Sequence, residues 1–275
     1  NFLIVSRKRR KVNTNLKTPP KGSAEFIVEK IDDLQNIIIP HFSNYPVFCA
    51  KLHAFKLFSQ IVSALNTKDN RTIEGRIEIL KMALSMNITT NRSKDRKELL
   101  FSLLGVSETK DIEFIENTIA NITSPITDNN IAGIIDGDGS FYISFNKNGS
   151  IKTGFSITGD KDSKPLLEGI QAKFKGIGSI KEGSKNELVY TITGLNQIID
   201  TLIPFIDKNP LFSERALHFY KFKTVSLILS GEQPLTLENK LKIVELAYDM
   251  NKQGKRRSLS KTDYINLIRN ASKIN

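Results

Sequence analysis

The sequence has few of the residues that disulfide-bonded, zinc-binding or membrane-spanning proteins need. Its single cysteine, Cys49, excludes an intramolecular disulfide and a cysteine-rich zinc site. The three histidines, His41, His53 and His218, lack the spacing of zinc ligands. No apolar run approaches the roughly 20 residues that span a bilayer. The charged run 7–11 follows too short an apolar stretch for a secretory signal. We therefore expect no membrane partner.

Acidic residues are in short supply relative to basic ones. The 275 residues include 40 Lys and Arg against 29 Asp and Glu, which gives a net charge of +11 and a pI near 9.6. This excess predicts an anionic partner, and nucleic acid is the first candidate. The hydrophobic content of 39% is that of a globular chain. The length suits one large domain or two medium ones.

The chain repeats itself at a constant offset. The ten residues from Ile39 to Phe48 resemble those from Ile203 to Phe212, and 204 − 40 gives an offset of 164. Further along, Phe55 falls on Phe219 at the same offset. One offset that holds over roughly sixty positions indicates an internal duplication.

Each copy is predicted to contain a strand, a helix, a turn and a second helix. Phe26 and Val28 alternate as a half-buried strand would. We expect a turn between paired prolines, because proline breaks helical hydrogen bonding. The pairs are Pro40 with Pro46 and Pro204 with Pro210. The apolar stripe that follows predicts a buried helix face, formed in the first copy by Phe48, Leu52, Phe55, Phe58 and Val62.

The repeat divides the chain into three parts. Residues 1–87 form an incomplete N-terminal repeat, and residues 88–124 a connector with an amphipathic stretch. Residues 125–275 form a complete C-terminal repeat with a basic tail and a last short helix.

A glycine-rich segment opens the second copy, between Pro125 and Phe141. Thr127 or Asp128 can cap a helix there, and Gly139 fits the end of it. One face of the predicted helix carries small residues at helical spacing, which would let another helix approach closely. This face is formed by Ala132, Gly133 and Gly137, together with one acid, Asp136. Asp138 lies where the helix ends, and because an acid there opposes the helix dipole, a bound cation is favoured beside it.

Two other interpretations of glycine-rich stretches fail. A calcium loop starting at Asp136 would place Phe141 where glycine is needed and Lys147 where glutamate is needed. A phosphate loop over 178–185 would need its lysine before the serine, and here the lysine follows it.

The segment from Ile131 to Gly139 resembles the signature of the LAGLIDADG homing endonucleases and the related group I intron maturases. The Gly139-Ser140-Phe141 continuation, the Ile-Pro-Phe turn and the basic run that ends at Arg257 match as well. The resemblance implies an α+β fold, a pseudo-symmetric pair of αββαββα units whose saddle-shaped antiparallel sheets lie on DNA. In this chain the first repeat is incomplete.

The resemblance also implies roles for single residues. The last acid of the motif, Asp138, would be catalytic by binding Mg²⁺ or another divalent cation at the scissile phosphate. Gly139 would place its backbone near that metal. Ala132, Gly133, Asp136 and Gly137 would form the interface with a second motif helix. Because the matching basic run of the family lies near the active centre, we hypothesise that Lys255 or Arg256 stabilises phosphate charge.

The repeat offset places the partner of Asp138 outside the sequence, because 138 − 164 gives −26. Metal-assisted cleavage of both strands needs carboxylates from two sides. Three explanations are open: a separate N-terminal fragment supplies the first motif helix, two chains dimerise, or a degenerate nuclease retains only binding. Dimerisation fits poorly, because the retained half repeat would compete for the same sheet partner.

Polar and basic residues around the predicted strands 141–145 and 153–158 are candidates for nucleic-acid binding. Side chains that suit base edges in the major groove are Tyr142, Ser144, Asn146, Ser156 and Thr158. Side chains that suit phosphates are Lys147, Lys152, Lys181 and Lys185, with Arg7, Arg9, Arg10 and Lys11 in the first copy.

Two functions follow from these observations. The first is an intron-encoded, metal-dependent endonuclease that makes a double-strand break in DNA at a long site, provided that the missing first motif is supplied. The second is an RNA-binding maturase or ribonucleoprotein component, without cleavage, that binds structured RNA. The abundance of Ile, Lys and Asn suits an AT-rich organellar genome, so we expect a mitochondrial protein.

Overall fold

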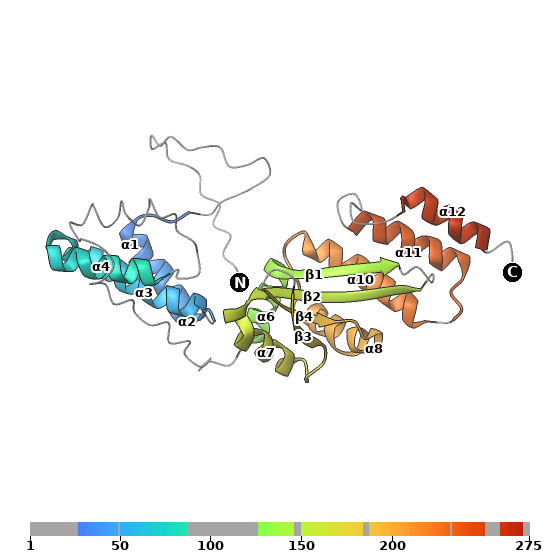
Figure 1. The fold of residues 1–275 in the computed structure, drawn as a ribbon, viewed down its shortest axis with the longest axis horizontal. Helices are drawn as coiled ribbons and strands as arrows, with labels where there is room; N and C mark the ends of the chain where they lie inside the picture. Colours follow the sequence, from blue (N-terminus) through green and yellow to red (C-terminus); the bar gives the residue numbers. More distant parts are fainter. Residues whose placement is uncertain are drawn as a thin grey trace.

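The second copy forms an αββαββα unit in the computed structural model (Figure 1). The structure describes residues 27–48, 50–86, 126–145, 150–183, 187–231, 233–250 and 259–271. Its first helix, α6, spans Asp128–Asp138 and leads directly into the sheet. None of the described helices has the length and apolarity to cross a membrane.

Four antiparallel strands form one sheet in the order β1-β2-β4-β3. The strands are β1 (Gly139–Phe145), β2 (Ile151–Asp160), β3 (Ser179–Glu182) and β4 (Glu187–Ile192). Between β2 and β3 lie the short η3 (Lys161–Ser163) and α7 (Lys164–Lys173), and after β4 come α8 (Leu195–Gln197), η4 (Ile198–Leu202) and α9 (Ile203–Lys208). The predicted α+β class and antiparallel sheet are confirmed.

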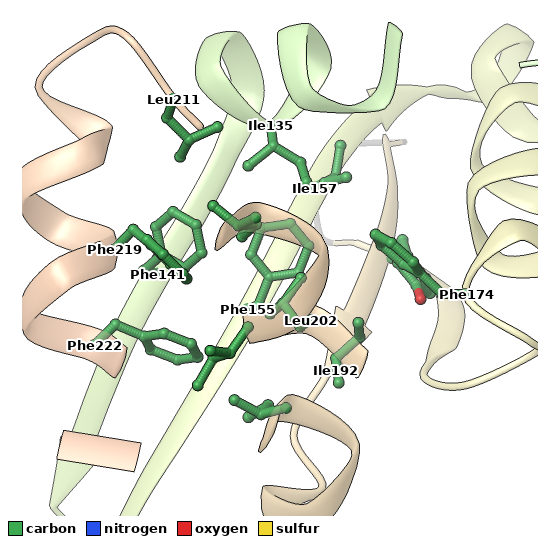
Figure 2. Packing of buried hydrophobic residues seen from close by; sticks show 14 of the residues in the cluster. Ile135, Phe141, Phe155, Ile157, Phe174, Ile192, Leu202, Leu211, Phe219 and Phe222 are labelled. Carbon is green, nitrogen blue, oxygen red and sulfur yellow. The ribbon is translucent and has the colours of Figure 1, made fainter. Parts of the chain in front are cut away.

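One face of the sheet is packed against helices. Phe141 and Phe155 point to this side, and their ring centroids lie 5.2 Å apart (Figure 2). The ring of Phe222, on α10 (Arg215–Ser230), also lies 5.2 Å from Phe141. Burial of each such side chain contributes about 1.5–3 kcal/mol. The apolar residues of β1 and β2 therefore alternate inward as the sequence predicts.

Two further helices follow α10 and pack in succession. α11 (Leu237–Met250) packs on α10, and α12 (Lys261–Ala271) packs on α11. The ring of Phe145, the last residue of β1, lies 4.5 Å from that of Tyr264 on α12. The predicted last short helix is therefore present.

The first copy repeats the helices of the second at the offset of 164. Its described elements are α1 (Ile31–Asp33), η1 (Leu34–Ile38), α2 (Ile39–Asn44), α3 (Ala50–Asn66), η2 (Asp69–Arg71) and α4 (Ile73–Ser85). The residues after α2 and α9 share an unusual backbone, with φ −123° and ψ 75° at Tyr45 and φ −124° and ψ 75° at Asn209. This agreement of helices and backbone supports the duplication.

The predicted helix, turn and helix are present in both copies, but the chain leaves the first helix only at Tyr45 and Asn209, next to the second proline of each pair. The segments from Ile39 to Asn44 and from Ile203 to Lys208 are helical, and Pro40 and Pro204 lie in their first turn. A π-helical segment precedes each proline. Because the residues before each proline are also helical, the missing proline N–H leaves one carbonyl of the preceding turn without its usual donor. The change to π-helical hydrogen bonding lets the backbone continue without a break.

The expected first-copy strand is absent from its described part. Residues 27–30, which include Val28, have no regular secondary structure, and Phe26 lies outside the described residues. A strand needs a hydrogen-bonded neighbour, and no described strand pairs with this stretch. The predicted connector, 88–124, lies outside the described residues, so the division at 87 and 125 stays a prediction.

Candidate nucleic-acid interface

The motif helix α6 begins at a capping box. The Asn130 amide N–H donates to the Thr127 hydroxyl at 3.2 Å, and the Thr127 amide N–H donates to Asn130 Oδ1 at 3.0 Å. Two otherwise unpaired amide groups are thereby satisfied. Ile131 and Ile135, one turn apart, are fully buried and fix the helix on the core. The predicted cap at Thr127 is confirmed.

Arg215 holds the other end of α6 by donating hydrogen bonds to three backbone carbonyls. Its Nε donates to the carbonyl of Asp136 at 2.8 Å, and its two terminal nitrogens donate to the carbonyls of Gly137 and Gly139. Carbonyls at a helix end have no intrahelical partner, and the helix dipole favours a cation there. The sequence predicted a bound metal as this cation; in the structure the Arg215 guanidinium occupies the carbonyl end.

The carboxylate of Asp136 is used within the second copy. It accepts hydrogen bonds from the amide N–H of Phe212 at 3.2 Å and from that of Ser213 at 3.1 Å. The Ser213 hydroxyl donates to it at 2.6 Å. The sequence-based expectation was packing at a helix–helix interface. In the described structure Asp136 ties α6 to the start of α10, 76–77 residues away, and its contact with a second motif helix stays a prediction.

Asp138 differs from Asp136 in having a free carboxylate. It is exposed, and no described residue donates a hydrogen bond to it or forms an ion pair with it. Two residues along a helix are about 200° apart around its axis, so these two acids face different surroundings. Asp138 therefore remains available to a ligand at the junction of α6 and β1.

The fit of a divalent cation at this junction is partial. A carboxylate oxygen is a ligand that Mg²⁺ and Ca²⁺ prefer. The Gly139 carbonyl already accepts from Arg215, so only its second lone pair could reach a metal. The described residues contain no cluster of three or more His, Cys, Asp or Glu that could hold a metal. Asp138 thus fits as one member of a larger ligand set.

The small-residue stripe of α6 is open at its C-terminal end in the described structure. Ala132 and Gly133 are half-buried and Gly137 is exposed. A Cβ atom placed on Gly137 would meet nothing within 4 Å. The second motif helix that would cover this face stays a prediction.

The outward face of the sheet carries short hydroxyl side chains next to the motif helix. One row crosses all four strands, because Ser140 pairs with Ser156, Ser156 with Thr191, and Thr191 with Ser179. In the next row Tyr142 pairs with Gly154, and beyond it Ser144 pairs with Lys152. The predicted nucleic-acid contacts that lie within the described residues share this one face; they are Tyr142, Ser144, Lys152, Ser156, Thr158 and Lys181.

The remaining predicted site residues lie outside the described residues. They are Arg7, Arg9, Arg10, Lys11, Asn146, Lys147, Lys185, Lys255 and Arg256. Their predicted roles stay predictions.

Arg215 and Ser213 are site residues that the sequence reasoning missed. No local pattern marks them, because their partners lie 76–79 residues away in the chain. The internal repeat holds a signal for Arg215: its counterpart at the offset of 164 is Lys51, another basic residue at the start of a helix.

Comparisons with known proteins agree with this arrangement. The sequence profile of the LAGLIDADG endonuclease family matches residues 131–226. A probable intron-encoded endonuclease 2 from Neurospora crassa is 32% identical over 231 residues, which are 82% of this chain and 50% of the relative. A probable intron-encoded DNA endonuclease 1 from Mycosarcoma maydis is 26% identical over 195 residues, 69% of this chain and 71% of the relative.

The fold is similar to that of a solved nuclease complex. The crystal structure of the I-LtrWI LAGLIDADG homing endonuclease bound to target DNA superposes with a TM-score of 0.71 at 26% identity. The match covers 82% of this chain and 73% of that one. The chain spans about half the length of the Neurospora crassa relative. With its profile match over the motif helix, sheet and α10, this chain belongs to the LAGLIDADG endonuclease family.

Proposed function

We propose that this chain binds DNA at a specific long site and takes part in metal-dependent double-strand cleavage there, as an intron-encoded endonuclease. The observation that carries the proposal is the free carboxylate of Asp138, exposed beside a sheet face rich in hydroxyl side chains. A nuclease needs this combination: a surface that positions the duplex and an acid that reaches its backbone.

The outward face of the sheet suits the major groove. A β-ribbon fits into that groove, and hydroxyl side chains can donate to or accept from base edges. Lys152 and Lys181 are exposed on the same face and would contact phosphates. Phosphate contacts by lysine make affinity fall as salt rises. The net charge of +11 favours the same partner.

Asp138 is the residue that would hold a divalent cation, on which LAGLIDADG endonucleases generally depend. Such a cation stabilises charge on the phosphate oxygens and lowers the pKa of an attacking water. Arg215 keeps the end of α6 in place, so that the acid is presented at a fixed position beside β1. A second carboxylate would come from a second motif helix that packs against Ala132, Gly133 and Gly137.

DNA is the nucleic acid that the relatives favour. One relative is named a DNA endonuclease, and the solved I-LtrWI enzyme is bound to target DNA. The RNA-binding maturase is therefore the second candidate function. The relatives are fungal and intron-encoded, and such endonucleases are generally encoded in organelles. A mitochondrial location extends the same proposal.

The test uses the intron-insertion locus of the host gene. The full chain is mixed with a duplex that spans the joined exons, and with a shuffled duplex of equal composition, at several salt concentrations. We expect at least a tenfold preference for the junction, with affinity falling as salt rises. Equal affinity for both duplexes would refute the proposal.

Cleavage is measured on the same duplex with Mg²⁺ and with a chelator, for the wild type and for Asp138→Asn. The variant should bind the junction as tightly as the wild type and cleave at least about a hundredfold more slowly, because a metal contributes several kcal/mol to charge stabilisation. Specific binding with undiminished cleavage by Asp138→Asn would remove Asp138 from the mechanism.

A further inference from the structure

The ring of Tyr142 lies across Gly154 on the neighbouring strand. The two residues are directly paired between β1 and β2. A Cβ atom placed on Gly154 would lie 2.3 Å from Cζ and 2.4 Å from the hydroxyl oxygen of Tyr142. Real Cβ atoms do not come so close, so the ring fills the space that a side chain at 154 would need. Glycine at this position thus leaves room for the tyrosine ring to lie over the interior strand β2.

The hydroxyl of this tyrosine has no hydrogen-bond partner among the described residues. Burial raises the pKa of Tyr142, so the hydroxyl keeps its proton at neutral pH and can both donate and accept. Within the described strands, Tyr142 is the only aromatic residue on the outward face. Its neighbours in the same strand, Ser140 and Ser144, are short.

We propose that Tyr142 determines sequence specificity through a hydrogen bond between its hydroxyl and a base edge, and that Gly154 leaves the space in which the ring lies. This inference rests on the proposed DNA-binding function. A neutral phenol over an interior strand faces the floor of the groove, whereas phosphates lie along the groove's rims.

The register also predicts where that base lies. Tyr142 is three residues beyond Gly139, which corresponds to about 10 Å at roughly 3.4 Å per residue of strand. DNA rises about 3.4 Å per base pair. With β1 placed along the axis of the groove, which is part of this proposal, the base that Tyr142 reads lies about three base pairs from the phosphate held at Asp138.

The experiment selects bound sites from a library of duplexes with randomised sequence, using the full chain, and then measures binding of single-base variants of the selected site. Tyr142→Phe removes the hydroxyl and keeps the ring, and Gly154→Ala displaces the ring. Tyr220→Phe is the matched control, because Tyr220 is 67% exposed on α10 and lies off the sheet. Circular dichroism checks that each variant folds.

The wild type should prefer one base at one position of the selected site. Tyr142→Phe and Gly154→Ala should each reduce that preference about tenfold, the size of one lost base contact, and leave the other positions unchanged. Tyr220→Phe should retain the full preference. If Tyr142→Phe keeps every preference of the wild type, the inference is wrong while the proposed function stands. If the wild type enriches no sequence, the proposed DNA recognition fails, and the inference fails with it.

Discussion

Replacement of Arg215 by methionine is predicted to destabilise the second copy, because it removes the charged donor from the end of α6. Methionine keeps much of the length and apolar bulk of the side chain. What is lost is the set of hydrogen bonds to the carbonyls of Asp136, Gly137 and Gly139.

The size of the effect follows from the three contacts. A hydrogen bond to a charged group contributes about 1.5–3 kcal/mol when water cannot replace it. Arg215 is half-buried and Gly137 is exposed, so water will recover part of this. We take about 1 kcal/mol per contact, and about 2–4 kcal/mol in all. For an unfolding unit of this size, about 3 kcal/mol lowers the melting temperature by roughly 6–12 °C.

The measurement is thermal and denaturant unfolding followed by far-ultraviolet circular dichroism, because the chain has no tryptophan to report by fluorescence. Arg215→Lys keeps the charge and loses the planar guanidinium with its several donors, so the stability of this variant should lie between those of the wild type and Arg215→Met. Arg269→Met is the matched control, since Arg269 is exposed on α12, and its effect should stay within about 0.5 kcal/mol. Equal stability of Arg215→Met and Arg269→Met would refute the assignment of Arg215 to the helix end.

Three further predictions separate structural from functional roles. Asp136→Ala should lower the free energy of unfolding by about 2–4 kcal/mol, because it strips the Ser213 contacts, whereas Asp138→Asn should change it by less than about 0.5 kcal/mol; denaturant titration of the two proteins compares them directly. Gly178 has a φ of +78° and a Cβ there would lie 2.6 Å from the Thr191 carbonyl, so Gly178→Ala should unfold at lower denaturant than Gly176→Ala, which shares the φ but has open space. Lys181→Ala should lower the slope of log affinity against log salt by about 1 on the selected duplex, and an unchanged slope would show that Lys181 contacts no phosphate.

The sequence predicts those features that depend on residues close together in the chain or on a repeated pattern. The constant offset predicted the duplication, and alternation along 141–145 predicted which residues of β1 face the core. The cap at Thr127 followed from the preference of hydroxyl residues for helix starts. Each of these patterns acts between residues a few positions apart, or between copies of one pattern.

The sequence does not predict the effect of the paired prolines, because that effect depends on the hydrogen bonding of the residues before them. Pro40 and Pro204 break no helix, since a π-helical segment before each one changes the hydrogen bonding. The position of a proline in the sequence does not show whether the proline will lie in a turn or in a helix.

The sequence by itself determined that two acids, Asp136 and Asp138, lie at the end of one motif helix, two positions apart. Only the tertiary structure decided between them. Asp136 accepts hydrogen bonds from Phe212 and Ser213, residues that are distant in the chain and are brought near by the packing of α10 on the sheet. Asp138 meets no such donor and stays free for a ligand. Because these contacts are set by packing over more than seventy positions, no local pattern could encode which acid is free.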